Sequence, residues 1–485
     1  MDPKADYTGE CRSNAFKGRS LPAICRVLPK LVQSEALNGC SAGDMDKDVS
    51  RQGVFFALQE PKHVDNPYPL YQRLRSETPF YWDFVWSAWF LTRYADVRTA
   101  LADPRLTTEN FPFDVSQLSP ALQKDLASLG RVMKSSVLYN DAPEHDRLRR
   151  PLNRAFNPNA FERLRPKMEL VAHELLAKAE RRGSIDFVSD YCEPLADYMI
   201  GELLGSPLAD RPELIDLCNR LRKFLTARRM GHETVLDAKA AVKALERLRA
   251  YIRAIIAGRR GHFADNVIAR SLAVEPNEAP PTEDEILSNC VLSLDAGVRN
   301  MSASIANAVI VLLRHPEEFA RLSDDPETMP AATEELLRYD SPVQVAVRSV
   351  PEEIEFGGRR IGPNQLLVLL LGAANRDPEQ FADPDRLDLT RRPNHHVSFG
   401  VGPHGCIGGW MTRFGLAIAV GAILHRQTEL RLTRSKLQWN LPLIRRTVRT
   451  LPVRVNRRPA YRQKSQLRKA RALSPKPNRL VQAAS

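Results

Sequence analysis

The pattern of apolar and polar positions separates a long helical part of the chain from a smaller part that is rich in short strands. Between residues 160 and 315, apolar residues recur mainly at helical spacing. A strand-like aromatic stretch at 80–94 precedes this part, and short apolar runs with turn signals follow it at 343–350 and 354–377. The pattern predicts a mainly α-helical α+β fold with a minor β-sheet region.

The longest helical signal lies beyond the middle of the chain. It begins where Thr282 and Glu285 form a capping box, and it continues through apolar sequence until Pro316. A helix of about 33 residues measures about 50 Å in length. Because this helix is apolar on several faces, we expect it to run through the centre of a large helical domain.

Composition and charge predict a globular protein with basic character near its end. Hydrophobic residues make up 43% of the chain and charged residues 26%, which is ordinary for a protein with a sizeable core. The net charge of +12 owes much to residues 457–485, which carry many cations and no acidic side chain. This placement weakens a nucleic-acid-binding interpretation. We expect a poorly ordered polar extension at 1–50, a folded domain over 51–456 and a disordered basic tail at 457–485.

The cysteines and apolar runs favour a cytoplasmic protein. The seven cysteines are scattered, odd in number and without a CxxC pair, so they indicate neither a disulfide framework nor a structural zinc site. The longest apolar runs, such as 414–424, are shorter than the roughly 18 residues that a membrane span needs. The N-terminus has no apolar core typical of a signal peptide.

One cysteine, Cys406, lies in a loop that is unusually rich in glycine. The stretch HHVSFGVGPHGCIGGW at 395–410 holds five glycines, and the apolar sequence after it predicts a buried helix. The N–H groups and dipole at a helix N-terminus favour a thiolate, and glycines let the backbone approach a large flat group. The pattern predicts a thiolate that binds a metal. The alternative is a small buried side chain, the commoner role of a cysteine.

The order of residues in this loop favours the metal ligand. FGVGPHGCIGG resembles the haem-ligand loop of the cytochrome P450 family. The match covers six positions: Phe399, Gly400, Gly402, His404, Cys406 and Gly408. The resemblance implies haem b with an axial thiolate from Cys406, and it makes Phe399 a cofactor contact.

Further resemblances to this family occur in its order along residues 55–455. The motif TEELLRYDSP carries Glu335 and Arg338, a pair at i and i+3 that by itself is often a solvated surface bridge. In the family such a pair is buried with an arginine of the following meander, and the resemblance assigns Arg386 to this place. The expected role of the three residues is structural.

The motif DAPEHDRLRR resembles the family's helix that borders the haem. It places His145 and Arg149 four residues apart on one helix face, a pattern that a solvated basic helix would also show. The resemblance implies that both side chains bind the haem carboxylates, with Arg348 and His404 as further donors. Buried carboxylates need such partners because an unpaired buried charge costs several kcal/mol.

The long helix departs from the family pattern at the position expected above the iron. Most members have Ala, Gly, any residue, an acid and Thr in sequence. This chain has Ala296 and Gly297, but Arg299 and Asn300 replace the acid and the threonine. We expect Asn300, with Ala296 and Gly297, to form the catalytic face, since an amide can hydrogen-bond oxygen, water or substrate. For Arg299 we favour pairing with a carboxylate of a neighbouring helix over contact with an acidic substrate.

The resemblance implies a monooxygenase that inserts one oxygen atom from dioxygen into an apolar small molecule. Terpenoid or steroid-like compounds would suit the apolar cavity of such an enzyme. The chain has no flavin or dinucleotide fingerprint after a strand. Electrons would therefore come from a ferredoxin and its reductase, docking on the cysteine side. Three arginines there are expected to add positive potential, namely Arg147, Arg150 and Arg413.

Other functions stay open. Arg299 and Asn300 suit an isomerase, a dehydratase or a peroxygenase that needs no reductase. The cysteine loop would also survive in a non-catalytic haem protein, and the basic tail could be a binding module. Residues 190–265 are expected to cover the substrate pocket. Four apolar side chains there are candidates for its lining, although ordinary core positions suit them better: Leu203, Leu221, Phe224 and Leu225.

Overall fold

The structure is a computed structural model that describes residues 53–108, 120–156, 158–230, 235–259, 261, 266–273, 279–440 and 444–457. The polar extension expected at 1–50 and the basic tail from 458 onward lie outside the described residues. The described part is mainly helical with small sheets, which confirms the predicted fold class.

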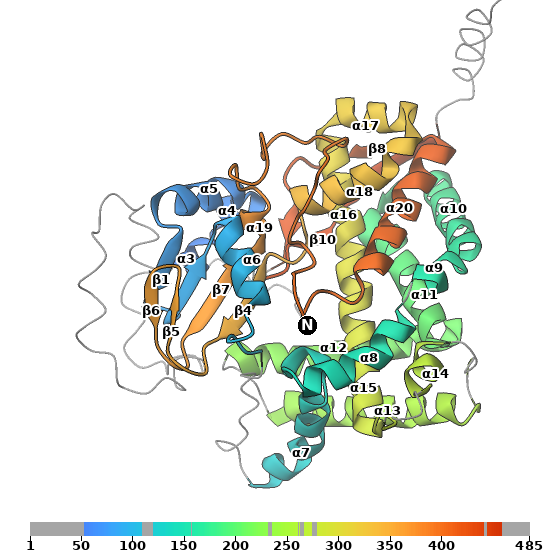
Figure 1. The fold of residues 1–485 in the computed structure, drawn as a ribbon. Helices are drawn as coiled ribbons and strands as arrows, with labels where there is room; N and C mark the ends of the chain where they lie inside the picture. Colours follow the sequence, from blue (N-terminus) through green and yellow to red (C-terminus); the bar gives the residue numbers. More distant parts are fainter. Residues whose placement is uncertain are drawn as a thin grey trace, which may run out of the picture.

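A four-stranded sheet forms one side of the molecule (Figure 1). Its strand order is β1-β2-β7-β4, with β2 and β7 parallel and the other two pairs antiparallel. The strands are β1 (Phe80–Asp83), β2 (Ala88–Leu91), β4 (Val345–Ser349) and β7 (Leu366–Leu370). Short helices accompany this sheet: α3 (Val54–Ala57), α4 (Pro61–Asp65), α5 (Tyr68–Glu77), α6 (Tyr94–Ala102) and α19 (Leu371–Ala374). The strands predicted at 80–94, 343–350 and 354–377 are thereby confirmed.

Three smaller pairings complete the β structure. The hairpin is β5 (Ile354–Phe356) with β6 (Arg359–Ile361). The three-stranded sheet has β11 (Pro452–Arg457) between β3 (Ser184–Asp186) and β8 (Thr428–Leu432). A short pair joins β9 (Gln438–Trp439) to β10 (Val448–Thr450).

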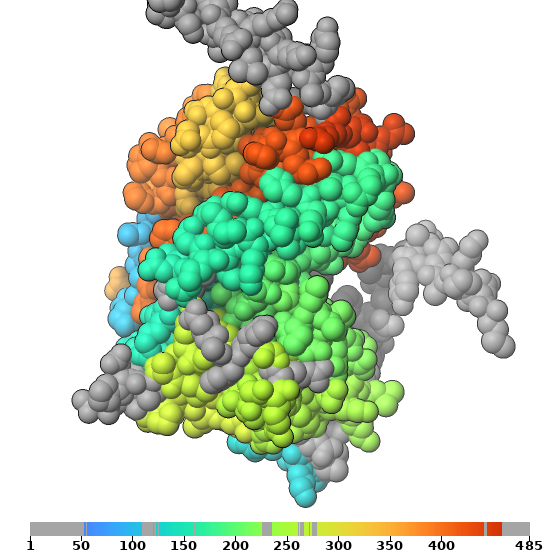
Figure 2. Space-filling view, turned by 90° about the vertical axis from the view of Figure 1, so that its right-hand side faces the viewer, coloured from blue at the N-terminus to red at the C-terminus, as the bar shows by residue number. Residues whose placement is uncertain are grey.

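Helices fill the other side of the molecule. They are α7 (Pro120–Lys134), α8 (Glu144–Ala155), α9 (Pro158–Glu162), α10 (Arg165–Arg182), α11 (Glu193–Leu204), α12 (Arg211–Met230), α13 (Val235–Ile256), α14 (Val267–Leu272), α15 (Glu283–Leu292), α16 (Val298–Arg314), α17 (Pro316–Asp324), α18 (Met329–Tyr339) and α20 (Gly409–Arg426). Figure 2 shows this face, on which the teal residues of α8 and α10 lie between red C-terminal segments and the yellow-green α13. One large apolar core joins these helices.

The predicted central helix is present, but its hydrogen bonding changes partway along. The capping box of Thr282 and Glu285 is confirmed, and the helix ends at Arg314 before Pro316. Between α15 and α16 a π-helical segment, η4 (Ser293–Gly297), widens the turn. The helix is long and apolar enough to cross a membrane, but 78% of its apolar window is buried inside the protein. It is therefore the core helix of the fold, as the sequence predicts.

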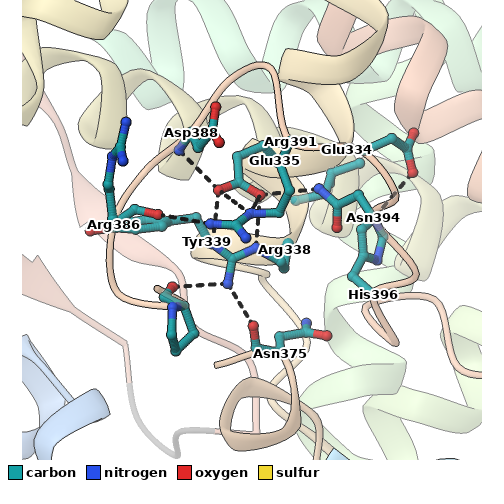
Figure 3. Close-up of polar contacts among 12 residues, drawn as sticks. Glu334, Glu335, Arg338, Tyr339, Asn375, Arg386, Asp388, Arg391, Asn394 and His396 are labelled. Atoms are coloured by element: carbon teal, nitrogen blue, oxygen red, sulfur yellow. Dashed lines mark hydrogen bonds and ion pairs between the residues drawn. The ribbon is translucent and has the colours of Figure 1, made fainter. Parts of the chain in front are cut away.

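A buried ion-pair network links α18 to the segment that leads into the cysteine loop (Figure 3). Glu335 and Arg338 are both fully buried, and the Arg338 guanidinium donates two hydrogen bonds to the carboxylate at 2.7 and 2.8 Å. Arg338 also donates to the carbonyls of Asn375 and Pro384. The pair is therefore structural and not a solvated surface bridge.

The third member of this network differs from the sequence-based assignment. Arg391, not Arg386, donates to both carboxylate oxygens of Glu335, each at 3.2 Å. The Arg386 side chain is exposed, and its carbonyl accepts a hydrogen bond from Arg391. Asn394 and the backbone N–H of Asp388 complete the shell around Glu335. The assignment of Arg386 was wrong because the chain turns after 384 and brings the later arginine back to the carboxylate.

Glu334, the neighbour of Glu335, binds the first turns of α20, the helix that follows the loop. Its carboxylate accepts hydrogen bonds from Arg413 of α20 at 2.6 and 2.8 Å, and His396 lies 3.2 Å away. Burial by itself raises the pKa of Glu334, but His396 and Arg413 outweigh it and lower the pKa to about 2. One helix turn thus holds both ends of the cysteine loop.

The corrected network makes a prediction about three variants. Glu335→Ala leaves Arg338 buried without its carboxylate and should lower the free energy of unfolding by about 3–5 kcal/mol. Arg391→Ala should also destabilise, but by less, because Arg338 keeps its partner. Arg386→Ala should stay within about 0.5 kcal/mol of wild type, as expected for an exposed side chain. Denaturant unfolding measures all three, and a larger loss for Arg386→Ala than for Arg391→Ala would contradict the network.

The lowered pKa of Glu334 predicts acid sensitivity. A folded pKa near 2 against an ordinary value of 4.5 means that Glu334 stabilises the protein above pH 4.5 and loses this contribution as the pH falls toward 2. The difference in unfolding free energy between wild type and Glu334→Gln should therefore shrink as the pH is lowered from about 6 to about 3.5. A difference that stays constant with pH would show that the charge of Glu334 is not involved.

Candidate haem site at the cysteine loop

The cysteine loop has the backbone that its glycines predict. Gly400 and Gly402 have φ of 67° and 79°, in the left-handed region that favours glycine. A side chain on Gly402 would also stand 3.0 Å from the Cα of Ala102 in α6. The N–H of Cys406 donates to the carbonyl of Phe399 at 2.7 Å, which closes the loop just before α20 begins at Gly409.

The Cys406 thiol is held among groups with opposing effects. Its side chain is accessible to solvent. Burial raises its pKa, while the N–H of Gly408 and the charges of Arg149 and Arg413 oppose this rise without cancelling it. The helix terminus alone therefore does not stabilise the thiolate, in contrast to the sequence-based expectation. A bound cation at the sulfur would do so.

Phe399 and Met411 pack around the two glycines that follow the thiol, Gly408 and Gly409. The Phe399 ring lies against Gly409 and under the Arg413 guanidinium, 4.5 Å from the ring centre. A Cβ atom added to Gly408 would lie 3.6 Å from the Met411 methyl group, and a Cβ atom added to Gly297 would lie at the same distance from it. Met411 therefore joins the π-helical segment of the central helix to the start of α20, a contact that no sequence motif indicated.

The three residues expected on the distal face have different surroundings. Gly297 packs against Ile200 so closely that a side chain there would clash at 2.5 Å. Ala296 is half-buried. Asn300 is half-buried, and its Oδ1 is buried without a hydrogen-bond partner among the described residues. An orphaned acceptor of this kind costs free energy unless a ligand or water completes it.

Arg299 pairs within its own helix. Its Nε lies 3.1 Å from Asp295 Oδ1, one turn earlier, and its Nη2 donates to Asn219 of α12. The expected carboxylate on a neighbouring helix is therefore not its direct partner. Burial raises the pKa of Glu193 in α11, and the nearby charge of Arg299 opposes this rise without cancelling it.

The four basic side chains that the resemblance assigns to the haem carboxylates lie around the loop. His145 and His404 lie with ring centres 4.4 Å apart, and the Arg149 guanidinium donates to the carbonyl of Gly405 at 2.6 Å. Arg348 is buried, and its guanidinium donates a hydrogen bond to the carbonyl of its neighbour Val347. Burial lowers the pKa of Arg348.

Sequence reasoning missed Asp141, which organises this cluster. His404 Nε2 lies 2.9 Å from its carboxylate, and Thr107 and Thr108 donate to it from the segment after α6. Burial of His404 lowers its pKa, although Asp141 opposes the change. Asp141 opens the motif DAPEHDRLRR, so its closeness to His145 was visible in the sequence, but its contact with His404 depends on the fold.

These side chains fit a haem. The Nε2 of His145 is buried and has no hydrogen-bond partner among the described residues, while its Nδ1 lies 3.1 Å from Asp146. A buried ring nitrogen without a partner is what a haem carboxylate would complete, with the imidazole in its protonated form. Arg348 likewise carries a buried charge that needs an anion, and Cys406 presents an accessible sulfur.

The arginines expected to attract a redox partner are partly neutralised. Arg147 forms ion pairs with Glu144 and Glu285, and Arg413 pairs with Glu334. Arg150 is exposed. The positive potential expected on this side is therefore weaker than the count of arginines suggests. The four apolar residues considered for the pocket, Leu203, Leu221, Phe224 and Leu225, belong to the core or pack against it.

Comparison with known proteins agrees with the geometry of the loop. The family model described as Cytochrome P450 matches residues 120–432. A biotin biosynthesis cytochrome P450 of Bacillus subtilis is 33% identical over 394 residues, which cover 80% of this chain and 96% of that protein. The 20-oxo-5-O-mycaminosyltylactone 23-monooxygenase of Streptomyces fradiae is 32% identical over 401 residues, covering 82% and 91%.

Solved structures show the same fold. The crystal structure of P450BioI in complex with acyl carrier protein ligated to hexadec-9Z-enoic acid has a TM-score of 0.73 and 30% identity, and the match covers 81% of this chain and 100% of that chain. A Bacillus megaterium cytochrome P450 in complex with corticosterone has a TM-score of 0.69 and 26% identity, covering 81% and 99%. The chain belongs to the cytochrome P450 family and is a haem-dependent monooxygenase of bacterial type.

Proposed function

We propose that Cys406 is the axial ligand of haem b and that the protein inserts one oxygen atom from dioxygen into an apolar small molecule. The observation that carries this proposal is an accessible cysteine sulfur just before the N-terminus of α20. It lies in a loop where Gly400 and Gly402 have positive φ and carry no side chains. When bound, haem supplies the redox chemistry that activates dioxygen, and a thiolate ligand favours cleavage of the O–O bond.

The basic side chains near the loop would hold the carboxylates of the haem. His145 and Arg348 suit this role best. The buried Nε2 of His145 has no hydrogen-bond partner among the described residues, and the Arg348 guanidinium donates only to the carbonyl of Val347 there. Arg149 and His404 already have partners in Gly405 and Asp141. Both orient the loop, and Arg149 adds positive charge around the same place.

Asn300 is the residue that we assign to oxygen handling or substrate orientation. Its unpartnered Oδ1 accepts a hydrogen bond from a water or a substrate hydroxyl, whereas its amide N–H donates. A threonine could do both through one rotating hydroxyl. The two functions are therefore separated onto two atoms here, which constrains the water or substrate that Asn300 can hold.

The electrons would come from a ferredoxin and its reductase in the cytoplasm. Among the described residues there is no flavin or dinucleotide-binding sheet, and the family model matches most of these residues. A terpenoid or steroid-like substrate is the expected class. The replacement of the usual acid and threonine favours, as a second candidate, a reaction that uses peroxide and needs no reductase. Product formation with dioxygen and a reductase system, but not with peroxide, supports the first candidate, and the reverse pattern supports the second.

The assignment of Cys406 predicts a spectroscopic signature. Reduced wild-type protein with carbon monoxide should show the absorption band that is diagnostic of thiolate ligation, and Cys406→Ala should lose it. Cys290→Ala is a matched control, because Cys290 is buried in the core and burial raises its pKa to about 12. Persistence of the band in Cys406→Ala, or its loss in Cys290→Ala with haem still bound, would refute the assignment.

The role of Asn300 predicts a change in coupling. With a turned-over substrate, Asn300→Ala should consume more reductant per product than wild type, because the acceptor that holds water or substrate is gone. Asn300→Thr restores a hydroxyl and separates loss of any polar group from loss of the amide. The ratio of product to reductant measures the effect, and equal ratios in wild type and Asn300→Ala would exclude Asn300 from the mechanism.

A further inference from the structure

Three arginines surround a single carboxylate at the π-helical segment of the central helix. Asp295 Oδ1 lies 3.1 Å from Arg299 Nε and 3.8 Å from Arg222 Nε, and Asp295 Oδ2 lies 3.7 Å from Arg445 Nη1. Arg222 comes from α12, and Arg445 comes from the segment between β9 and β10. Three parts of the chain that are far apart in sequence thus direct cations to one point.

The cluster carries more positive charge than its carboxylates neutralise. Among the described residues, Asp295 is the only carboxylate within 4 Å of Arg222 or Arg445. Glu193 senses the charge of Arg299, but from beyond that distance. Counting Asp295 and Glu193 together still leaves one guanidinium without an opposite charge. Three cations around one acid repel one another, which costs free energy unless another anion joins them.

The hydrogen bonding of the cluster is also incomplete. Arg222 Nε and Asp295 Oδ1 are buried and have no hydrogen-bond partner among the described residues, because the 3.1 Å contact of Asp295 Oδ1 with Arg299 Nε is an ion pair without hydrogen-bond geometry. The contacts of Arg222 and Arg445 with Asp295 are longer than a hydrogen bond. Burial and the neighbouring Arg299 lower the pKa of Arg222. Each of the three arginine side chains is 36–38% exposed, so their guanidinium groups stay within reach of a ligand.

The position of the cluster connects it with the candidate haem site. Asp295 precedes Ala296 and Gly297, and Gly297 touches Met411 beside the cysteine loop. Arg445 forms an isolated bridge with Val343, just before strand β4, whose other end carries Arg348. Val343 and Arg348 are five residues apart, about 16 Å along an extended chain. The cluster therefore lies at the central helix, beside the residues expected above the iron, and is separate from the side chains assigned to the haem carboxylates.

From these observations we infer that Arg222, Arg299 and Arg445 form a binding site for the carboxylate of the substrate, so that the protein acts on an apolar acid. The inference rests on the proposed function, which it narrows from apolar molecules in general to monocarboxylic acids. Guanidinium groups suit this role because their planar donors match a carboxylate in two parallel hydrogen bonds. The acid would be held by its charged end while its apolar part extends toward the haem. Asp295 fixes the arginines and competes with the substrate for them.

The test compares acids with their uncharged esters on the haem-loaded full chain. Dodecanoic, hexadecanoic and abietic acids and their methyl esters serve as probes, and isothermal titration calorimetry gives the Kd of each. At least one acid should bind about 10-fold or more tightly than its ester, since an ester keeps the shape but loses the charge. If no acid exceeds its ester, including the case in which no acid binds, the inference is overturned.

Variants of the arginines identify the site. Arg222→Gln and Arg445→Gln should each weaken binding of the preferred acid by about 10- to 100-fold and leave the affinity of its ester nearly unchanged. Arg220→Gln is the matched control on the same helix, because Arg220 is exposed and pairs with Asp216. Asp295→Asn removes the competing charge and should tighten binding of the acid, an effect opposite in sign to that of a damaged fold. Equal losses for acid and ester in Arg222→Gln would contradict the assignment.

The spectrum of reduced protein with carbon monoxide separates failure of this inference from failure of the proposed function. A preparation that has the thiolate band but shows no preference for acids refutes the carboxylate site alone. A preparation that takes up haem but lacks the band refutes the ligation by Cys406, whatever its affinity for acids.

Discussion

The position of the cysteine loop depends on the hydrogen bonds and ion pairs of the buried Glu335 carboxylate. A carboxylate with no exposed surface is tolerated only when hydrogen bonds replace its lost hydration. Here Arg338 comes from the same helix, and the other donors come from the meander before the loop. The meander must therefore follow one path around Glu335. That path ends at His396, which pairs with Glu334. The same carboxylate accepts hydrogen bonds from Arg413 of α20, so it links the start of the loop to the helix that follows it.

Two separate groups of basic side chains mark the places where anionic groups would bind. One lies beside the cysteine loop, where His145 and Arg348 have buried polar groups that a haem carboxylate would satisfy. The other surrounds Asp295 on the central helix. The unpartnered amide oxygen of Asn300 lies five residues from Asp295 in the chain. A charged anchor and a polar group on one helix are suited to hold a substrate at two points, which restricts how it can move.

Local motifs allowed the loop, the capping box and the Glu335–Arg338 pair to be predicted, because each depends on residues that are close in sequence. The choice between Arg386 and Arg391 could not be made in this way, since both lie in one irregular segment and only its folded path decides which reaches Glu335. Periodicity likewise could not show the π-helical segment, which preserves the apolar character of the helix. The meeting of Arg222 and Arg445 at Asp295 depends on long-range packing, although the i, i+4 spacing of Asp295 and Arg299 was readable.

The central claim is that Cys406 supplies a sulfur ligand to haem iron in a position defined by the network around Glu335. X-ray absorption at the iron edge of the substrate-free protein tests it most directly, because the first coordination shell distinguishes sulfur from nitrogen and oxygen. The account predicts one sulfur in that shell for wild type and for Cys290→Ala, and none for Cys406→Ala. A shell that contains only nitrogen and oxygen in the wild-type protein would contradict it.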